Sequence, residues 1–163
     1  MQMRNLIKEK IAANGYAVGA FVASSSATNC EILAMNGYDF VIIDCEHAQT
    51  DSETAVNMFR ACEMYGMAPM VRVYNPYDGP MMSRLLDVGA HGIMVPLVND
   101  APQAKNIVDN TKYAPVGRRG ANGGRGPRWG AYDDYVKVCN DNTLTFVQCE
   151  SIEGVNNIEE IAA

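Results

Sequence analysis

The sequence predicts an α/β fold of the (β/α)8 TIM-barrel type, on three observations. Short apolar runs alternate with amphipathic stretches along the 163 residues. The apolar runs are continuous, as in parallel strands that are covered on both faces. Polar residues follow the runs at the same end of each, where barrel enzymes build their sites. A complete barrel takes about 250 residues. We therefore expect the first five βα units here, in one partial barrel domain spanning residues 1–163.

The elements follow one another in a repeated strand–helix order, which implies right-handed crossovers. Apolar periodicity places the opening helix, and capping boxes mark later helix starts at Thr28 with Glu31 and at Thr50 with Glu53. Strands are expected at residues 16–24, 39–44, 68–73, 91–98 and 143–150. Helices are expected from Leu6 to Gly15, Thr28 to Gly37, Thr50 to Gly66 and Asp78 to Gly89, from Asn99 or Asp100 onward, shortly after the loop 117–130, and from Ser151 onward.

The main alternative is an open nucleotide-binding sheet, which normally has a glycine-rich turn after its first strand. The stretch FVASSSAT has no such turn. The polar residues that follow the five strands, all at the carboxyl-terminal rim, instead favour the barrel. They are Ser24 to Ser26, Asp44, Glu46, His47, Arg72, Asn99, Gln148 and Glu150.

The composition excludes several classes of protein. A net charge of −6 argues against a general nucleic-acid binder. The five cysteines contain no CxxC pair, which suggests free thiols in a reducing compartment. The charged amino terminus does not resemble a signal peptide, and no apolar run approaches the roughly 20 residues of a membrane span. We expect a cytoplasmic protein that acts on a small molecule.

His47 follows the second strand, three residues after Asp44. An Asp that orients a His is a common arrangement for a general base near neutral pH. The structural alternative is a His that caps a helix or bonds a backbone carbonyl. Glu46 beside it, and the polar residues on the same rim, favour the catalytic interpretation. His91 precedes the fourth strand, at the opposite end, and is expected to be structural.

Two further strands end in charged residues. Arg72 lies within a buried strand and needs an anionic partner, either a structural carboxylate or an anionic substrate. Glu150 ends the fifth strand with Gln148 on the same side. Glu150 is a candidate ligand for Mg²⁺ or Mn²⁺, or else a helix cap or ion-pair acceptor. No Lys lies at a strand end on this rim, so a Schiff-base mechanism has no candidate residue.

The loop from Gly117 to Gly130 carries four arginines in an acidic chain, and it lacks the GK[ST] ending of a P-loop. Three alternatives stay open for it. It could close over an anionic substrate, with glycines as hinges. It could equally be a solvated loop or a contact with another subunit.

Together these motifs resemble one family. GYDFVIIDCEHAQTD, MVRV, LLDVGAHGIMVPLV, YAPVGRRG and FVQCES occur in the same order in the metal-dependent pyruvate aldolases of the HpcH/HpaI aldolase and citrate lyase family. That family includes 4-hydroxy-2-oxoheptanedioate and 2-keto-3-deoxy-sugar-acid aldolases. The resemblance runs from about Gly15 to the last residue.

The resemblance implies a (β/α)8 barrel, a trimeric or hexameric homo-oligomer, and a divalent cation (Mg²⁺, Mn²⁺ or Co²⁺). It implies reversible cleavage of 4-hydroxy-2-oxo acids to pyruvate and an aldehyde. In that reaction His47, paired with Asp44, would be the base, and Arg72 would stabilise the enolate. Gln148 would line the pyruvate site, and Glu150 would bind the metal.

Two features depart from the family pattern. Cys45 stands where many members have Gly. The second metal carboxylate of the family follows a sixth strand, so we expect it beyond Ala163 and expect this chain to be a truncated piece. Two alternatives to the aldolase are a citrate-lyase-β-like acyl-CoA lyase and a non-catalytic barrel fragment.

Overall fold

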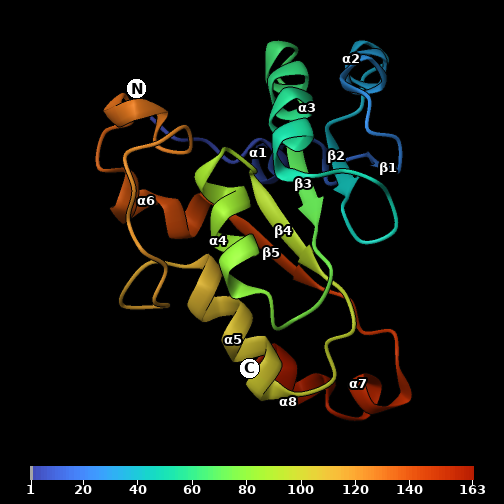
Figure 1. The fold of residues 1–163 in the computed structure, drawn as a ribbon, viewed down its shortest axis with the longest axis vertical. Helices are drawn as coiled ribbons and strands as arrows, with labels where there is room; N and C mark the ends of the chain where they lie inside the picture. Colours follow the sequence, from blue (N-terminus) through green and yellow to red (C-terminus); the bar gives the residue numbers. More distant parts are fainter. Residues whose placement is uncertain (1) are drawn as a thin grey trace.

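The computed structural model describes residues 2–163 as five parallel strands in the sequential order β1-β2-β3-β4-β5 (Figure 1). An open nucleotide-binding sheet would reverse direction at a switch point, whereas a sequential order is the one that a barrel requires. The barrel interpretation is therefore favoured by topology as well as by pattern. The strands are β1 Gly19–Val22, β2 Phe40–Asp44, β3 Ala68–Arg72, β4 Gly92–Val95 and β5 Leu144–Val147.

Most helices follow a strand and cover one face of the sheet, whereas the first helix packs on the other face. α2 packs against α3, and α4 packs against α5 (Figure 1). The helices are α1 Leu6–Asn14, α2 Ala27–Met35, α3 Ser52–Met64, α4 Gly79–Asp87, α5 Ala101–Thr111, α6 Tyr135–Asn142, α7 Ile152–Asn156 and α8 Ile158–Ala162. None of the helices in residues 2–163 is long and apolar enough to cross a membrane.

Alternate residues of each strand enter two different cores. Val41 and Ile43 of β2 point to the larger core, which the strands share with helices α2 to α5. Ile42 and Met70 point to the other face and pack with Ile7 of α1 in a smaller core. The strand period of two residues produces this division. It also places Asp44 and Arg72 on the same face as the smaller core, two residues beyond Ile42 and Met70.

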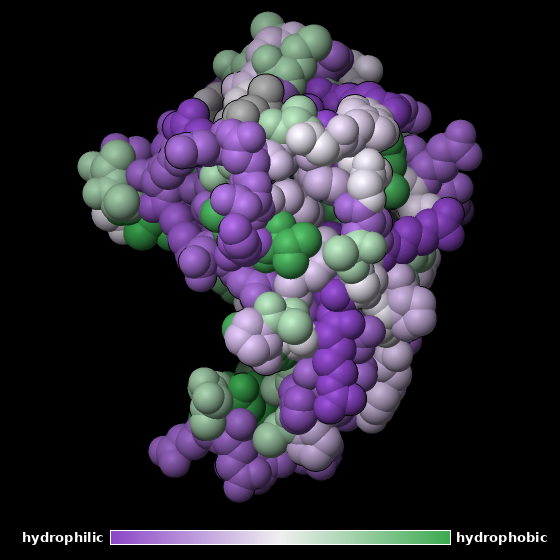
Figure 2. Space-filling view, turned by 90° about the vertical axis from the view of Figure 1, so that its left-hand side faces the viewer, coloured by the Kyte–Doolittle hydropathy of each residue, from purple (hydrophilic) through white to green (hydrophobic). Residues whose placement is uncertain are grey.

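The face of the smaller core is the one that a closed barrel would enclose. Gly19 leaves room there, because a Cβ atom at Gly19 would lie 2.2 Å from the ring of Phe40, which is far too close. α1 closes the amino-terminal end, where Asn5 and Lys8 donate hydrogen bonds to the backbone carbonyls of Asn142 and Asp141. The space-filling view shows a hollow on one side of the molecule, with apolar surface at its margin (Figure 2).

The predicted helix starts at Thr28 and Thr50 were wrong by one or two residues. The side chain of Ser26 caps α2 and that of Asp51 caps α3, each accepting a hydrogen bond from the backbone N–H three residues on. Ser and Asp are strong caps in their own right, so no Thr–Glu box is needed. The single helix expected after Ser151 is two short helices that meet at Asn157.

Candidate active site

The carboxyl-terminal ends of β2 and β3 bring Asp44 and Arg72 together. The two residues are partners in the parallel register of these strands. Arg72 donates from Nε to Oδ1 of Asp44 at 3.0 Å and from Nη2 to Oδ2 at 2.8 Å. This bidentate pair is nearly buried, with 14% of the Arg72 side chain and 5% of the Asp44 side chain exposed. Such fork geometry fixes the plane of the guanidinium as well as its position.

Other rim residues surround the Arg72 guanidinium. Oε2 of Glu46 lies 3.2 Å from Nη1, and the ring of Phe21 from β1 lies against the guanidinium with its centroid 5.0 Å away. The hydrogen bond to Asp44 raises the pKa of Arg72, burial opposes it, and the charges of Asp44, Glu46 and Glu150 add to the rise. The arginine is therefore a permanent cation in the site.

The pKa of Asp44 is lowered by its partners. Burial alone would raise it, but the hydrogen bonds from Arg72 and from the backbone N–H groups of Glu46 and His47 outweigh burial. Asp44 is therefore a fixed anion, with an arginine on one side and the backbone of the following turn on the other.

The structure does not place the His47 imidazole against the Asp44 carboxylate, as the predicted dyad requires. Asp44 accepts hydrogen bonds from the backbone N–H of His47, not from its ring. The nearest carboxylate to the imidazole is that of Glu46, with Oε2 at 3.6 Å from Nε2. The His47 side chain is 70% exposed, so it is accessible to a substrate. Asp44 and His47, three residues apart, therefore form a turn at the strand end through the backbone, and their side chains do not pair.

Glu150 and Gln148 lie past β5 on the same rim. Oε1 of Glu150 accepts a hydrogen bond of 2.8 Å from the backbone N–H of Leu97. Leu97 presents that N–H from a left-handed conformation, with φ of 57°. Oε1 of Gln148 is buried and has no hydrogen-bond partner among the described residues. A buried acceptor without a partner is costly, so it marks a place where a donor or cation from a ligand could bind.

The charges of the rim suit a cation, but residues 2–163 do not complete a metal site. Asp44 and Glu46 contact the Arg72 guanidinium, Glu150 lies on the same rim, and oxygen ligands suit hard divalent cations. However, no group of three or more His, Cys, Asp or Glu side chains in these residues is arranged to hold a metal ion.

Cys45 does not add a reactive group to the site. Its side chain is fully buried in the larger core. Burial raises the pKa of its thiol to about 11, with the charges of Asp44 and Asp51 adding to the effect. Because the thiolate is the reactive form, this cysteine stays inert near neutral pH.

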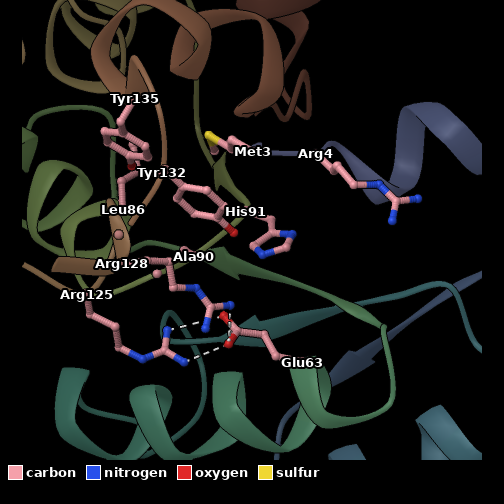
Figure 3. A pocket seen from close by; sticks show the side chains of 12 residues that line it. Met3, Arg4, Glu63, Leu86, Ala90, His91, Arg125, Arg128, Tyr132 and Tyr135 are labelled. Carbon is pink, nitrogen blue, oxygen red and sulfur yellow. Dashed lines mark hydrogen bonds and ion pairs between the residues drawn. The ribbon is translucent and has the colours of Figure 1, made fainter. Parts of the chain in front are cut away.

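The arginine-rich loop lies at the opposite end of the sheet from this rim. Its Arg125 and Arg128 both bind the Glu63 carboxylate at the end of α3, with contacts of 2.9 and 2.8 Å (Figure 3). Its Arg119 pairs with Asp87 at the end of α4. The suggestion that the loop closes over a substrate at the rim is therefore wrong, because three of its arginines bind the amino-terminal end.

His91 lines a small polar pocket with these residues, as Figure 3 shows. Burial lowers its pKa, and the charges of Arg128 and Arg125 lower it further while Glu63 opposes them. This agrees with the structural interpretation of His91 drawn from the sequence. The pocket has water-accessible space of only about 20 Å³, enough for roughly one water.

Sequence reasoning missed three contributors to the rim. Phe21, Leu97 and the link from Glu46 to both Arg72 and His47 had no role assigned. The DxEH spacing of Asp44, Glu46 and His47 was a signal for the last of these, whereas nothing in the sequence indicates the left-handed backbone of Leu97.

Comparison with known proteins identifies the family. The model of the HpcH/HpaI aldolase/citrate lyase family matches residues 17–163. The chain belongs to this family. It is 40% identical over 147 residues to a hydroxypyruvate/pyruvate aldolase from Chromohalobacter salexigens, covering 89% of this chain and 58% of that protein. It is 34% identical over 163 residues to a 2-keto-3-deoxy-L-rhamnonate aldolase from Escherichia coli K12, covering 98% and 60%.

A solved structure supports the same conclusion for the fold. The HpcH/HpaI aldolase from Desulfitobacterium hafniense superposes with a TM-score of 0.88 at 29% identity, covering 98% of this chain and 61% of that one. The predicted α/β, TIM-barrel-type fold is confirmed by this match. The chain spans about 60% of the length of the family members that it matches.

Proposed function

We propose that this rim belongs to an aldolase that cleaves a 4-hydroxy-2-oxo acid into pyruvate and an aldehyde. The observation that carries the proposal is the Asp44–Arg72 pair beside the accessible His47 imidazole: a fixed cation next to a group that can take up a proton. Both named relatives are aldolases of oxo acids, which supports this reaction over the acyl-CoA lyase alternative.

In the proposed reaction, His47 accepts the proton of the 4-hydroxyl group as the C3–C4 bond breaks and the aldehyde leaves. The electrons of that bond form the enolate of pyruvate, and the same imidazole returns a proton to C3. Proton transfer by such a base typically contributes about 10²–10⁴-fold to the rate. The Arg72 guanidinium stabilises the enolate oxygen, because two of its five N–H groups remain after Asp44 has taken two and Glu46 has paired with Nη1. Gln148 contacts the pyruvate end of the substrate.

Class II aldolases of this family are generally dependent on a divalent metal. We propose that Glu150 contributes one ligand to such a site, with Mg²⁺ or Mn²⁺ favoured by its oxygen donors and Co²⁺ also possible. The second carboxylate would come from residues that follow Ala163 in a longer protein. Isothermal titration of Mn²⁺ into this chain and into the longer protein tests this assignment. We expect at least tenfold tighter binding by the longer protein, and Glu150→Gln should weaken it.

Pyruvate release from a 4-hydroxy-2-oxo acid tests the reaction. It would be measured with and without Mg²⁺ or Mn²⁺, and after chelation, for this chain and for a chain extended by three strands. We expect metal-dependent release from the extended chain and its loss in His47→Ala. Activity of the extended chain alone would support the partial-domain interpretation of residues 1–163. No pyruvate from either chain would overturn the aldolase proposal.

The assembly and location of the protein are part of the proposal. We propose a homo-oligomer, a trimer or hexamer, for the longer protein. Light scattering of the longer protein would test the subunit number. The five free cysteines support a reducing location such as the cytoplasm.

A further inference from the structure

We propose that Asn99 is a positioning residue for the Glu150 carboxylate. It fastens the turn after β4, which presents the backbone N–H of Leu97, to the segment after β5, which carries Glu150 itself. The role of Glu150 as a metal ligand rests on the proposed function, whereas the contacts of Asn99 do not. Asn99 would therefore act on the metal site through the backbone of two neighbouring segments.

The Glu150 carboxylate is held at one oxygen. The residue is exposed, and a glutamate side chain on the surface samples several rotamers unless a partner fixes it. Its partner is the backbone N–H of Leu97, which donates to Oε1 over 2.8 Å. Among residues 2–163, no hydrogen bond engages Oε2, which stays available to a cation. The direction of the Leu97 N–H therefore sets the direction of the carboxylate.

The Leu97 N–H takes its direction from a strained turn. Leu97 has a φ of 57°, in the left-handed region that a leucine rarely adopts and that persists only where the surroundings enforce it. Its side chain is 49% exposed, so packing of that side chain does not enforce the conformation. The hydrogen bond from the N–H of Val98 to the carbonyl of Gln148 is long, at 3.4 Å. The stronger contacts come from the next residue, Asn99.

Asn99 connects this turn to both neighbouring segments. Its Oδ1 accepts a hydrogen bond from the Ser151 hydroxyl, and its carbonyl accepts one from Nδ2 of Asn157 at 2.9 Å. Its N–H donates to Oε1 of Gln103 in α5 at 2.7 Å. Ser151 follows Glu150 directly in the chain, so its bond to Asn99 fixes the backbone from which the carboxylate extends. Asn99 therefore holds together the two segments that the carboxylate bridges.

Gly154 shows how closely the two segments approach. A Cβ atom at this position of α7 would lie 2.8 Å from the carbonyl oxygen of Val98, which is too close for such a contact. The N–H of Gly154 donates to the Ser151 hydroxyl at 2.9 Å, so this hydroxyl caps α7 and also donates to Asn99. The backbone approach is independent of the Asn99 hydrogen bonds, and it places the start of α7 directly against the turn after β4.

The alternative is that Asn99 only stabilises the fold, and Asn106 separates the two roles. Both asparagines are half-buried. Nδ2 of Asn106 donates to the carbonyl of Pro76 at 2.8 Å, so this bond ends at the turn after β3 rather than at the turn that carries Leu97. Asn106→Ala is therefore the matched control. It should lower stability in the same way but leave the binding of a metal unchanged.

Amide hydrogen exchange tests the contact without metal or activity. The readout is the exchange rate of the peptide that contains the Leu97 and Val98 amides, measured by mass spectrometry on this chain and on the longer protein. We expect Asn99→Ala and Ser151→Ala to speed this exchange about tenfold, because each removes one side of the same hydrogen bond and loosens the turn. Ser151→Thr keeps the hydroxyl and should exchange like the unaltered protein, as should Asn106→Ala.

The affinity for Mn²⁺ tests the consequence for the site. Loss of an outer partner that orients a metal ligand typically weakens metal binding by about 10–100-fold. By isothermal titration of the longer protein, we expect about tenfold weaker binding in Asn99→Ala and in Ser151→Ala. The double variant should lose no more than either single one, because both changes break one contact. At saturating Mn²⁺ the kcat of Asn99→Ala should recover, whereas that of His47→Ala should not.

The outcomes separate this proposal from the aldolase proposal. If Asn99→Ala and Ser151→Ala bind Mn²⁺ as tightly as Asn106→Ala does, the positioning role is wrong, and it is equally wrong if the unaltered longer protein binds no Mn²⁺. If the affinity falls as expected but the longer protein releases no pyruvate, the positioning role stands and the aldolase proposal fails. Where Asn99→Ala does not fold, the difference between Ser151→Ala and Ser151→Thr decides the question.

Discussion

The two ends of the sheet both carry arginine–carboxylate pairs, but the charges are arranged differently. At the amino-terminal end, Arg125 and Arg128 share the Glu63 carboxylate, and the loop that carries them is held in place. At the carboxyl-terminal rim, Asp44 and Glu46 both contact the Arg72 guanidinium, and Glu150 lies past β5 on the same rim. The first arrangement uses cations to fix a loop. The second leaves an excess of negative charge and an accessible imidazole beside the guanidinium.

The largest effect should follow from removing Arg72, the guanidinium that Asp44 and Glu46 share at the rim. Arg72→Met keeps the length of the side chain but leaves the buried Asp44 carboxylate unpaired. Breaking such a pair typically costs about 3–5 kcal/mol of stability. We expect a loss of this size in the free energy of unfolding measured with urea, and no pyruvate release by the longer protein. A loss below about 1 kcal/mol would show that the pair is solvated and that the geometry of the rim is not as described.

A smaller effect is expected at the other end. Glu63→Gln removes the charge that Arg125 and Arg128 share, and hydrogen bonds to charged groups contribute about 1.5–3 kcal/mol each. Because two arginines can still reach an amide oxygen and water, we expect a loss near the lower value, with activity of the longer protein unchanged. Glu9→Gln, in the exposed pair with Arg4, is the matched control and should cause no measurable change. Lost activity in Glu63→Gln would mean that the two ends are coupled.

The contrast also shows what a sequence can predict. The strands and the polar rim could be predicted, because the apolar runs and the polar residues that end them lie in consecutive positions of the sequence. The partner of each charged residue could not be predicted in this way. Arg72 meets Asp44 through the register of β2 with β3, a property of two distant segments. Arg125 meets Glu63 across 62 positions of sequence, so the loop could not be assigned to an end of the barrel.

The orientation of His47 has a different origin. Asp44 and His47 are three residues apart, and a carboxylate at that distance can bond either the imidazole or the backbone N–H. At the end of a buried strand the backbone must be satisfied first. The turn from Asp44 to His47 therefore uses the carboxylate, and the imidazole stays exposed.

His91 gives the amino-terminal end a pH dependence. Burial places its folded-state pKa below the unfolded value of about 6.5. The unfolded chain therefore binds the proton more readily, so the stability contributed by neutral His91 is complete above pH 6.5 and is lost as pH falls from that value through the lower folded-state pKa. We expect the urea midpoint to be lower at pH 5.5 than at pH 7.5, and the difference to shrink in His91→Gln. His47→Gln is the control, and an equal drop in all three proteins would assign the effect to other groups.

The smallest effect concerns backbone strain, which both ends contain. Leu97 at the rim and Trp129 in the arginine-rich loop have φ values of 57° and 51°. A left-handed conformation costs a non-glycine residue about 1–2 kcal/mol, and glycine recovers this while losing about 0.4–1 kcal/mol through the freedom of the unfolded chain. Because both side chains are well exposed, we expect Leu97→Gly and Trp129→Gly to stabilise the protein by similar amounts, below about 1 kcal/mol each, in urea unfolding. Leu97→Gly keeps the N–H that binds Glu150, so it should not weaken Mn²⁺ binding by the longer protein. If it does, the leucine side chain, and not only its backbone, orients the carboxylate.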